Sequence, residues 1–402
     1  MNDAAPTPTL MNGFPPAPDG QVTLANWRTG PFNKWAFQHV REIVPSADIA
    51  NDPDNVWRLP SAPMDLAGLR IDGDMDVHRF LVATDTDGIV ILHRGRIVAE
   101  AYANGMTYAT PHILMSVSKS MLGMLSGILA ATGKLDLDAP VASLVPEVGG
   151  TAYKGATLRQ LLDMRAGILF DENYLATSGP IIAYRKSTNW NPLEPGERPT
   201  DLRSFYPQLV QSDGPHGGRF HYVSPNTDLL GWAIERATGE RYADVMSRLV
   251  WQPLGAERSA YITVDRLGAP RCAGGFCATA RDLARVGQLL VQGGRRGARQ
   301  VVPESWIDDL VEKGDRAAWD QGDFLSYYPG LPISYRSKWY VLHGPSPMLF
   351  GLGVNGQNLF VDRENEIVVA KFSSQAMPMD EARIMLTMRA VDRIRAFLMT
   401  AQ

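Results

Sequence analysis

The stretch SVSKSMLGMLSGILAATGK, residues 116–134, decides the fold. Its apolar residues recur every three or four positions, which predicts a helix with a buried face that ends at Gly133. The residues before it are expected to enter from a loop, so Ser116 should stand at the helix N-terminus. Lys119 follows one turn later and therefore lies on the same face as Ser116.

This Ser-x-x-Lys pair offers a nucleophile and a base. A serine hydroxyl attacks poorly until another group takes its proton. The partial positive charge of a helix N-terminus favours an oxyanion and disfavours an ammonium group, and burial lowers the pKa of a lysine further. The alternative is structural: Ser116 caps the helix and Lys119 extends its ammonium group to solvent. The spacing alone leaves both interpretations open.

The composition excludes several classes of function. The 402 residues are 45% hydrophobic and 20% charged, which is typical of a soluble globular protein. A net charge of -4 without any basic run argues against a nucleic-acid partner. No apolar run is long enough to cross a bilayer and no signal peptide is evident, so we expect a cytoplasmic protein without a membrane partner. Cys272 and Cys277 are too few for a disulfide framework and are expected to be buried thiols.

Two hairpins are predicted near opposite ends of the chain. Each has two β-rich runs around a short turn, at residues 89–93 with 97–103 and at 357–361 with 367–372. The pattern from residue 116 to about 255 is mostly helical. Strands at both ends with helices between them predict an α+β fold, in which both hairpins join one antiparallel sheet flanked by helices.

The chain is expected to divide into two lobes after an N-terminal extension, residues 1–30. Residues 31–115 and 270–402 would form the α/β lobe, and residues 116–269 a mainly helical lobe. Ser116 falls where the chain first passes from the sheet to the helical lobe, and clefts between lobes are common ligand sites.

Residues 171–218 have the least regular pattern. Pro, Gly, Asn and Ser are frequent there, and loops of this length inside a compact domain are usually functional or disordered. The aromatic residues Tyr174, Tyr184 and Trp190 favour a substrate-binding loop or lid. A surface excursion packed by its own aromatic residues explains them equally well.

Two further stretches accompany the Ser-x-x-Lys pair in order along the chain: TLRQLLDMRAG at 157–167 and FHYVSPNT at 220–227. Together the three resemble the penicillin-recognising serine hydrolases, which include class C β-lactamases, D-amino-acid peptidases and family VIII carboxylesterases. Residues 31–37 and 278–287 are similar to the subgroup of 6-aminohexanoate-dimer hydrolases, the nylon-oligomer hydrolases, and their esterase-like relatives. The resemblance runs from about residue 30 to the C-terminus and implies a β-lactamase/transpeptidase-like fold.

The resemblance implies a role for each matching residue. Ser116 matches the acylated serine, Lys119 its partner base, and Tyr222 the tyrosine that relays a proton to the leaving group. A neighbouring ammonium group is expected to hold the Tyr222 phenol near its ionised form. The family places an asparagine two residues after this tyrosine. Here Ser224 and Asn226 both remain candidates for that polar role.

The third element of the family is a short β-edge strand, which residues 353–357 match. Its backbone N–H at Val354 would complete an oxyanion hole with the N–H of Ser116. Asn355 stands where a cationic or imidazole side chain is common, which weakens the case for recognition of a substrate carboxylate. Substrate contacts are expected from a further set of side chains: Tyr174, Arg185, Trp190, Asn226 and Asn355.

The stretch Tyr184-Arg185-Lys186 in the expected substrate loop is basic, which disfavours a substrate with an ammonium group. We therefore expect a serine hydrolase of small-molecule short-chain esters, with weaker activity on linear amides. The alternatives are a 6-aminohexanoate-dimer amide hydrolase and a catalytically silent binding protein. A β-lactamase is disfavoured because no Lys-Thr-Gly and no export signal are evident. Neither a metal nor an organic cofactor is implied, and a homodimer is left open.

Overall fold

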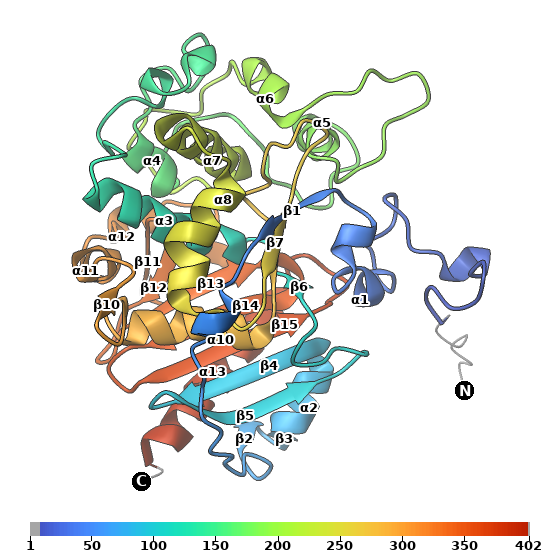
Figure 1. The fold of residues 1–402 in the computed structure, drawn as a ribbon, viewed down its shortest axis with the longest axis vertical. Coiled ribbons are helices and arrows are strands. Elements are labelled where there is room, and N and C mark those ends of the chain that lie inside the picture. The colour runs from blue at the N-terminus through green and yellow to red at the C-terminus, as the bar shows by residue number, and fades with distance from the viewer. Residues whose placement is uncertain (1–8, 401–402) are drawn as a thin grey trace.

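Seven antiparallel strands form the central sheet of the computed structural model, which describes residues 9–400 (Figure 1). Both predicted hairpins belong to this sheet, and β15 and β4, from opposite ends of the chain, pair with each other. In spatial order the strands are β11 (Ile333–Arg336), β12 (Trp339–Leu342), β13 (Met348–Gly353), β14 (Gln357–Asp362), β15 (Ile367–Ser373), β4 (Thr86–His93) and β5 (Arg96–Tyr102). The prediction of one antiparallel sheet built from both ends is confirmed.

Helices cover both faces of this sheet. Successive side chains of a strand point to opposite faces, and every residue of β4 is buried. Val90 joins the core under α10 (Ala280–Val291), whereas Ile91 joins the core under α13 (Glu381–Thr400). A Cβ added at Gly287 of α10 would lie 2.4 Å from Val368 Cγ1, so glycine lets α10 approach β15 closely.

A group of helices lies above the sheet in Figure 1, and α3 contacts both this group and the sheet. Helix α3 (Val117–Ala131) contacts β12, β13 and β14 on one side and α7 on the other. Around it lie α4 (Leu158–Leu162), α5 (Pro180–Ser187), α6 (Leu202–Phe205), α7 (Ser224–Thr238) and α8 (Tyr242–Met246). The segment 171–218, predicted to be irregular, therefore contains the short helices α5 and α6.

A smaller antiparallel sheet pairs the strand shortly before Ser116 with strands that follow the helices around α3. It has the order β1 (Ser46–Ile49), β7 (Ala260–Thr263), β8 (Phe276–Ala278) and β6 (His112–Ile113). The remaining elements are short: the ladders β2 (Arg70–Asp72) with β3 (Met75–Asp76) and β9 (Arg295–Arg296) with β10 (Arg299–Gln300), and the helices α1 (Asn33–Ala36), α2 (Val77–Ala83), α9 (Gln252–Leu254), α11 (Glu304–Glu312) and α12 (Arg316–Trp319).

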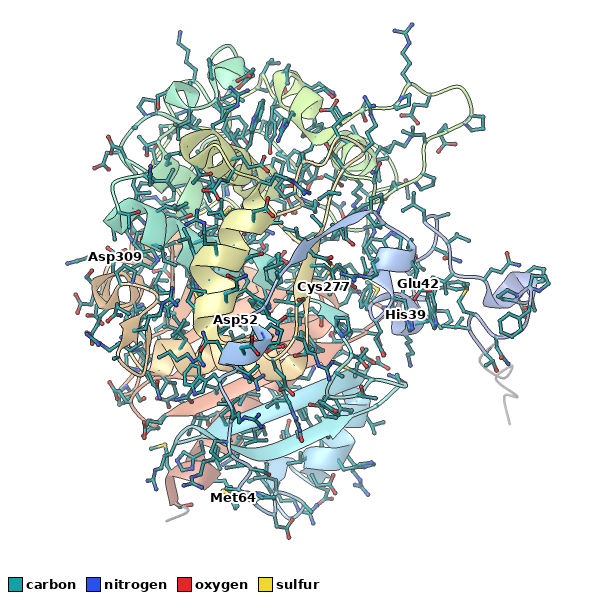
Figure 2. The ribbon with its side chains drawn as sticks, in the orientation of Figure 1. His39, Glu42, Asp52, Met64, Cys277 and Asp309 are labelled. Carbon is teal, nitrogen blue, oxygen red and sulfur yellow. The ribbon has the colours of Figure 1, made fainter. Side chains whose placement is uncertain are left out.

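Both cysteines are buried free thiols, as predicted. Cys277 lies on β8, and Figure 2 shows it among the side chains packed around the small sheet. Within residues 9–400, no helix combines the length and the hydropathy needed to span a bilayer. The division into lobes at residues 31, 116 and 270 stays a prediction.

Candidate active site

Ser116 stands directly before the first residue of α3. It occupies the N-cap position, but its side chain makes no capping hydrogen bond. The preceding residue, Met115, has a φ of 46°, a backbone conformation that non-glycine residues rarely adopt. The structural alternative, in which Ser116 serves as a helix cap, is therefore wrong, and its hydroxyl is free for another partner.

That partner is Lys119. The side chain is buried, with 1% of its surface exposed, so the alternative in which it reaches solvent is also wrong. Its Nζ donates to Ser116 Oγ at 2.8 Å and to the Ala273 carbonyl oxygen at 2.7 Å. Burial lowers the pKa of Lys119 to about 7, although the nearby carboxylates of Glu172 and Asp228 oppose that shift. A large share of neutral amine is therefore present near pH 7.

Tyr222 lies beside this pair. The Lys119 Nζ is 4.9 Å from the centroid of the Tyr222 ring, and the ring stacks on Phe324 at a centroid distance of 4.5 Å. Burial raises the pKa of the Tyr222 phenol, and its contact with the Ser116 hydroxyl only partly opposes that rise. The expectation that a neighbouring ammonium group holds the Tyr222 phenol near its ionised form is wrong, because burial raises the pKa of the phenol above its ordinary value. The phenol is a proton donor at neutral pH.

The backbone around Tyr222 is fixed by Asp323. One carboxylate oxygen, Oδ2, accepts from the Tyr222 N–H at 2.9 Å and lies 2.7 Å from His221 Nδ1. The other His221 nitrogen lies 3.0 Å from the Ile168 carbonyl oxygen. Both ring nitrogens of His221 thus bind groups other than Ser116 or Lys119, so this histidine orients the segment and takes no proton from Ser116.

The stretch at 353–357 is not an edge strand. Strand β13 ends at Gly353 and is the third of seven strands, and residues 354–356 form a tight turn into β14. A Cβ added at Gly353 would lie 2.6 Å from the Leu114 carbonyl oxygen and 3.1 Å from Met115 Cβ. Glycine therefore allows the end of β13 to pack against the residues before Ser116. The next residue, Val354, lines the same cavity as Ser116.

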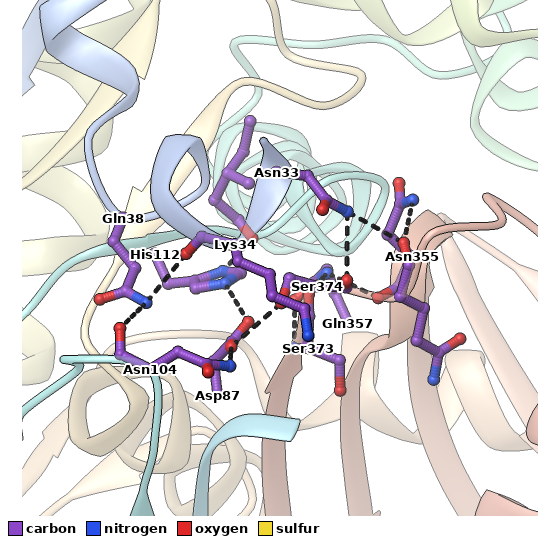
Figure 3. A network of polar contacts seen from close by, with 12 residues as sticks. Asn33, Lys34, Gln38, Asp87, Asn104, His112, Asn355, Gln357, Ser373 and Ser374 are labelled. Atoms are coloured by element: carbon purple, nitrogen blue, oxygen red, sulfur yellow. Dashed lines mark hydrogen bonds and ion pairs between the residues drawn. The ribbon is translucent and has the colours of Figure 1, made fainter. Parts of the chain in front are cut away.

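A buried polar network holds this turn in place (Figure 3). Asn355 Nδ2 donates to the Gln375 carbonyl oxygen at 2.7 Å, and Asn33 Nδ2 from α1 donates to the same oxygen at 3.0 Å. Gln357 Nε2 donates to the Ser373 carbonyl oxygen at 2.6 Å. The amide of Asn355 is thus engaged with the backbone after β15, although the residue also lines the cavity.

Two cavities share part of their walls at this site. One of about 350 Å³ is lined by Ser116, and the other, of about 560 Å³, is lined by Tyr222. Glu172, Tyr174, Leu175 and Pro378 line both. The first cavity also contains four of the residues predicted from sequence to contact substrate: Tyr174, Arg185, Trp190 and Asn355.

The two candidates for the polar role after Tyr222 are placed differently. Ser224 lines the first cavity, and its Oγ donates to Glu172 Oε1 at 2.5 Å. Asn226 is completely buried, and its Oδ1 accepts from the Tyr153 hydroxyl at 2.9 Å. Asn226 lines neither cavity, so direct contact with a substrate requires Ser224 instead.

Several residues around the site were not recognised from sequence: Arg28, Glu172, Asp228 and Arg271. Asp228 Oδ1 accepts from the Ala273 N–H at 2.7 Å, and its Oδ2 accepts from Arg271 and Tyr184. Asp228 therefore holds the segment whose carbonyl oxygen accepts from Lys119. It directly follows the stretch 220–227, which was the only available signal. Among the residues described, no three His, Cys, Asp or Glu side chains are grouped to hold a metal ion.

Comparison with known proteins adds the family. Residues 79–391 match the Beta-lactamase family model. The chain is 34% identical over 365 residues to the 6-aminohexanoate-dimer hydrolase of Paenarthrobacter ureafaciens, covering 91% of each chain. It is 27% identical to the esterase EstB of Burkholderia gladioli over 44% of this chain and 45% of that protein. A Bacillus anthracis structure, named as a candidate 6-aminohexanoate-dimer hydrolase, superposes with a TM-score of 0.85 at 28% identity over 95% of this chain and 98% of its own.

The comparisons and the geometry agree on one class of chemistry. The matched family model covers the elements that carry Ser116, Lys119 and Tyr222. The relatives named above include an amide hydrolase and an esterase, and the fold is β-lactamase/transpeptidase-like. The chain belongs to the beta-lactamase family and is a serine hydrolase.

Proposed function

We propose that this protein hydrolyses short-chain carboxylic esters through an acyl-enzyme on Ser116, with linear amides as poorer substrates. One observation carries the proposal: a buried Lys119 with a pKa near 7 donates to a serine hydroxyl at 2.8 Å, at the wall of a cavity. A neutral amine in that position can take the hydroxyl proton as the oxygen attacks.

The reaction has two acyl-transfer steps. Ser116 Oγ bonds to the ester carbonyl carbon while Lys119 takes its proton, and the carbonyl oxygen becomes an oxyanion. The tetrahedral intermediate collapses, the bond to the alcohol oxygen breaks, and Tyr222 donates its proton to that oxygen. Lys119 returns a proton to the Tyr222 oxygen. A water oxygen then bonds to the acyl carbon while Lys119 takes a proton from the water. The bond from that carbon to Ser116 Oγ breaks, Lys119 returns the proton to Oγ, and the carboxylic acid leaves.

Two backbone N–H groups stabilise the oxyanion, those of Ser116 and Val354. The N–H of Ser116 stands at the start of α3, where the partial positive charge of the helix adds to its effect. Each such donor contributes about 2.7–4 kcal/mol to lowering the barrier. The close packing of Gly353 against the backbone before Ser116, which a Cβ would prevent, supports Val354 as the second donor.

The charge of the cavity supports esters over ammonium-bearing amides. Arg185 lines the cavity, whereas Lys186 does not line it and forms an ion pair with Glu197 at 2.6 Å. A positively charged substrate would meet the guanidinium group of Arg185. The similarity to a 6-aminohexanoate-dimer hydrolase, 34% over 91% of the chain, favours amide hydrolysis of such dimers as the second candidate function.

The test is a substrate panel on the wild type and on Ser116→Ala. We expect hydrolysis of p-nitrophenyl butyrate and ethyl butyrate, slower release from a 6-aminohexanoate dimer, and a fall in kcat/KM of at least about a thousandfold in Ser116→Ala. Turnover of the dimer equal to or above that of the esters would refute the ester preference. Failure of a fluorophosphonate to label the wild type would instead indicate a silent binding protein.

A further inference from the structure

Three arginine side chains line the cavity beside Ser116: Arg28, Arg185 and Arg271, which we call the arginine pocket. They come from distant parts of the chain, namely the N-terminal segment, α5 and the loop before β8. Among the described residues lining this cavity, Glu172 is the single acidic one. The cavity wall therefore carries an excess of positive charge.

Some N–H groups of the arginine pocket have no hydrogen-bond acceptor among the described residues. The Nε atoms of Arg28 and Arg271 are buried and have no hydrogen-bond partner among residues 9–400. Arg271 is paired with Asp228, but neither Arg28 nor Arg185 forms an ion pair within the described chain. Their other contacts are neutral, with Asn191 Oδ1 and with the Tyr174 carbonyl oxygen. Glu172 offsets part of the charge of Arg185, but the partly buried Arg28 has no carboxylate partner in the described part of the chain. A guanidinium group that is removed from water without a paired anion is costly, which indicates a ligand that supplies one.

Aromatic rings fix these guanidinium groups in advance. The guanidinium carbons of Arg28 and Arg271 lie 5.9 Å and 4.9 Å from the centroid of the Trp190 ring, and Trp190 Nε1 donates to Thr263 Oγ1 at 3.1 Å. Burial and the two neighbouring arginines lower the pKa of Arg28 to about 9. The three positive charges thus repel one another, Asp228 and Glu172 offset part of that repulsion, and a bound anion would relieve more of it.

The position of Tyr222 indicates which half of the substrate enters the arginine pocket. Tyr222 donates to the leaving group and lines the second cavity, not the arginine pocket. The acyl half, bonded to Ser116, therefore extends into the arginine pocket. Apolar side chains such as Leu24 and Ile181 share the wall with the arginines, which suits an aliphatic chain with a charged end.

We propose that the arginine pocket binds a carboxylate at the far end of the acyl chain, so that the preferred substrates are monoesters of aliphatic dicarboxylic acids. The inference rests on the proposed function, because it takes Ser116 as the point of acylation. A guanidinium group matches a carboxylate in charge and planar geometry. Glu172, whose oxygens accept from Ser224, faces the same space and opposes a doubly charged anion. It also provides the rival interpretation, a receptor for a substrate ammonium group.

The test compares p-nitrophenyl esters that differ only at the far end of the acyl chain. For chains of four to eight carbons, one series ends in a carboxylate, one in its methyl ester and one in an ammonium group. We expect the best carboxylate substrate to have a kcat/KM at least about tenfold above its methyl-capped match, with the ammonium series lowest. Equal values for the carboxylate and capped series, or a preference for ammonium, would overturn the inference.

Substitutions test whether Arg28 and Arg185 cause the preference for a substrate with a terminal carboxylate. In Arg28→Met and Arg185→Met, the ratio of kcat/KM for the carboxylate substrate to that for its capped match should fall at least about tenfold, and Arg185→Lys should restore part of it. Arg248→Met is the matched control, because Arg248 is exposed and pairs with Glu240 far from the cavity. An unchanged ratio in both arginine variants would count against the inference. Arg271 is left intact because its pairing with Asp228 supports the Lys119 site.

A binding measurement separates this inference from the proposed function. Titration calorimetry of monomethyl adipate, which carries one carboxylate, into Ser116→Ala should show binding that weakens with salt and is lost when Arg28→Met and Arg185→Met are added. Absence of monomethyl adipate binding overturns the inference even if esters are hydrolysed. If monomethyl adipate binds but no ester is hydrolysed in a Ser116-dependent way, the proposed function fails and the inference that the arginine pocket binds a carboxylate is kept. Thermal melts check that each variant is folded.

Discussion

Two buried lysine–serine pairs occur in this molecule, and their chemistry is alike. Lys119 Nζ donates to Ser116 Oγ at 2.8 Å, and Lys371 Nζ donates to Ser373 Oγ at 2.5 Å. Each lysine has 1% of its surface exposed, and burial lowers the pKa of each to about 7. Judged by the distance, the burial and the pKa, both pairs contain a serine activated by a neutral amine.

The surroundings of the two serines differ. Ser116 lines a cavity and stands at the start of a helix, with the Val354 backbone at the same wall. Ser373 ends β15, lines neither cavity of the site, and has its N–H and carbonyl oxygen bound to the Gln357 side chain (Figure 3). A nucleophile also needs an approach path for the carbonyl and donors for the oxyanion, and those separate the two pairs.

The largest expected effect tests this distinction directly. Lys119→Met should lower kcat/KM for ethyl butyrate at least about a hundredfold, because general-base catalysis contributes about 10²–10⁴. Lys371→Met, the matched control, should stay within about threefold of the wild type. Steady-state kinetics on both folded variants decide the matter. A larger loss of kcat/KM in Lys371→Met than in Lys119→Met would contradict the assignment of Lys119 as the base.

The next largest effect concerns protonation of the leaving group, which we expect only at the Ser116 site. Tyr222→Phe removes the proton donor, so hydrolysis of ethyl butyrate should fall about a hundredfold. Hydrolysis of p-nitrophenyl butyrate should fall far less, since p-nitrophenoxide leaves without a proton. Tyr261→Phe is the control, because Tyr261 is a buried phenol on β7 away from both cavities. Equal losses on the two esters would show that Tyr222 does not protonate the leaving group.

A smaller effect is expected from Gly353, which ends β13 directly before the turn that contains Val354. In Gly353→Ala the new Cβ would lie 2.6 Å from the Leu114 carbonyl oxygen and displace Val354. A partly lost oxyanion donor should lower kcat about tenfold while KM changes little. Gly68→Ala is the control, because a Cβ there meets nothing within 4 Å. A kcat unchanged by Gly353→Ala would exclude the Val354 N–H from the oxyanion hole.

The sequence was most informative where the site is local. Ser116 and Lys119 are three residues apart on one helix, so spacing alone could bring them together. The second acceptor of Lys119, the Ala273 carbonyl oxygen, lies 154 residues away and depends on how the loop before β8 packs. No periodicity encodes such a contact. Arg28 lies near Arg185 and Arg271 only because distant parts of the chain pack together. The sequence therefore indicated the charge of Arg185 but not that of the other two arginines.

The errors in the predicted elements also have physical causes. Residues 353–357 were assigned to an edge strand because the family resemblance implies one there, and β11 and β12, which cover that side of β13, were not recognised. Each of these two strands is four residues long. The Ile-Ser-Tyr-Arg of β11 alternates over too few positions to indicate a strand, and the Trp-Tyr-Val-Leu of β12 has no polar alternation. Helix α5 was missed because Pro180 and the polar residues around it resemble a loop, although proline is well tolerated in the first turn of a helix.

The smallest expected effect is a shift in a pH profile, and it identifies which lysine is observed. Deprotonation of Lys119 should make kcat/KM rise with pH through a midpoint of about 7. Lys371 has the same approximate pKa, so the midpoint alone does not distinguish them. The carboxylate of Glu172 raises the pKa of Lys119, and Asp85 raises that of Lys371. Glu172→Gln should therefore move the midpoint to lower pH, because the neutral amide no longer favours the ammonium form. Asp85→Asn should leave it in place, and the opposite pattern would assign the titration to Lys371.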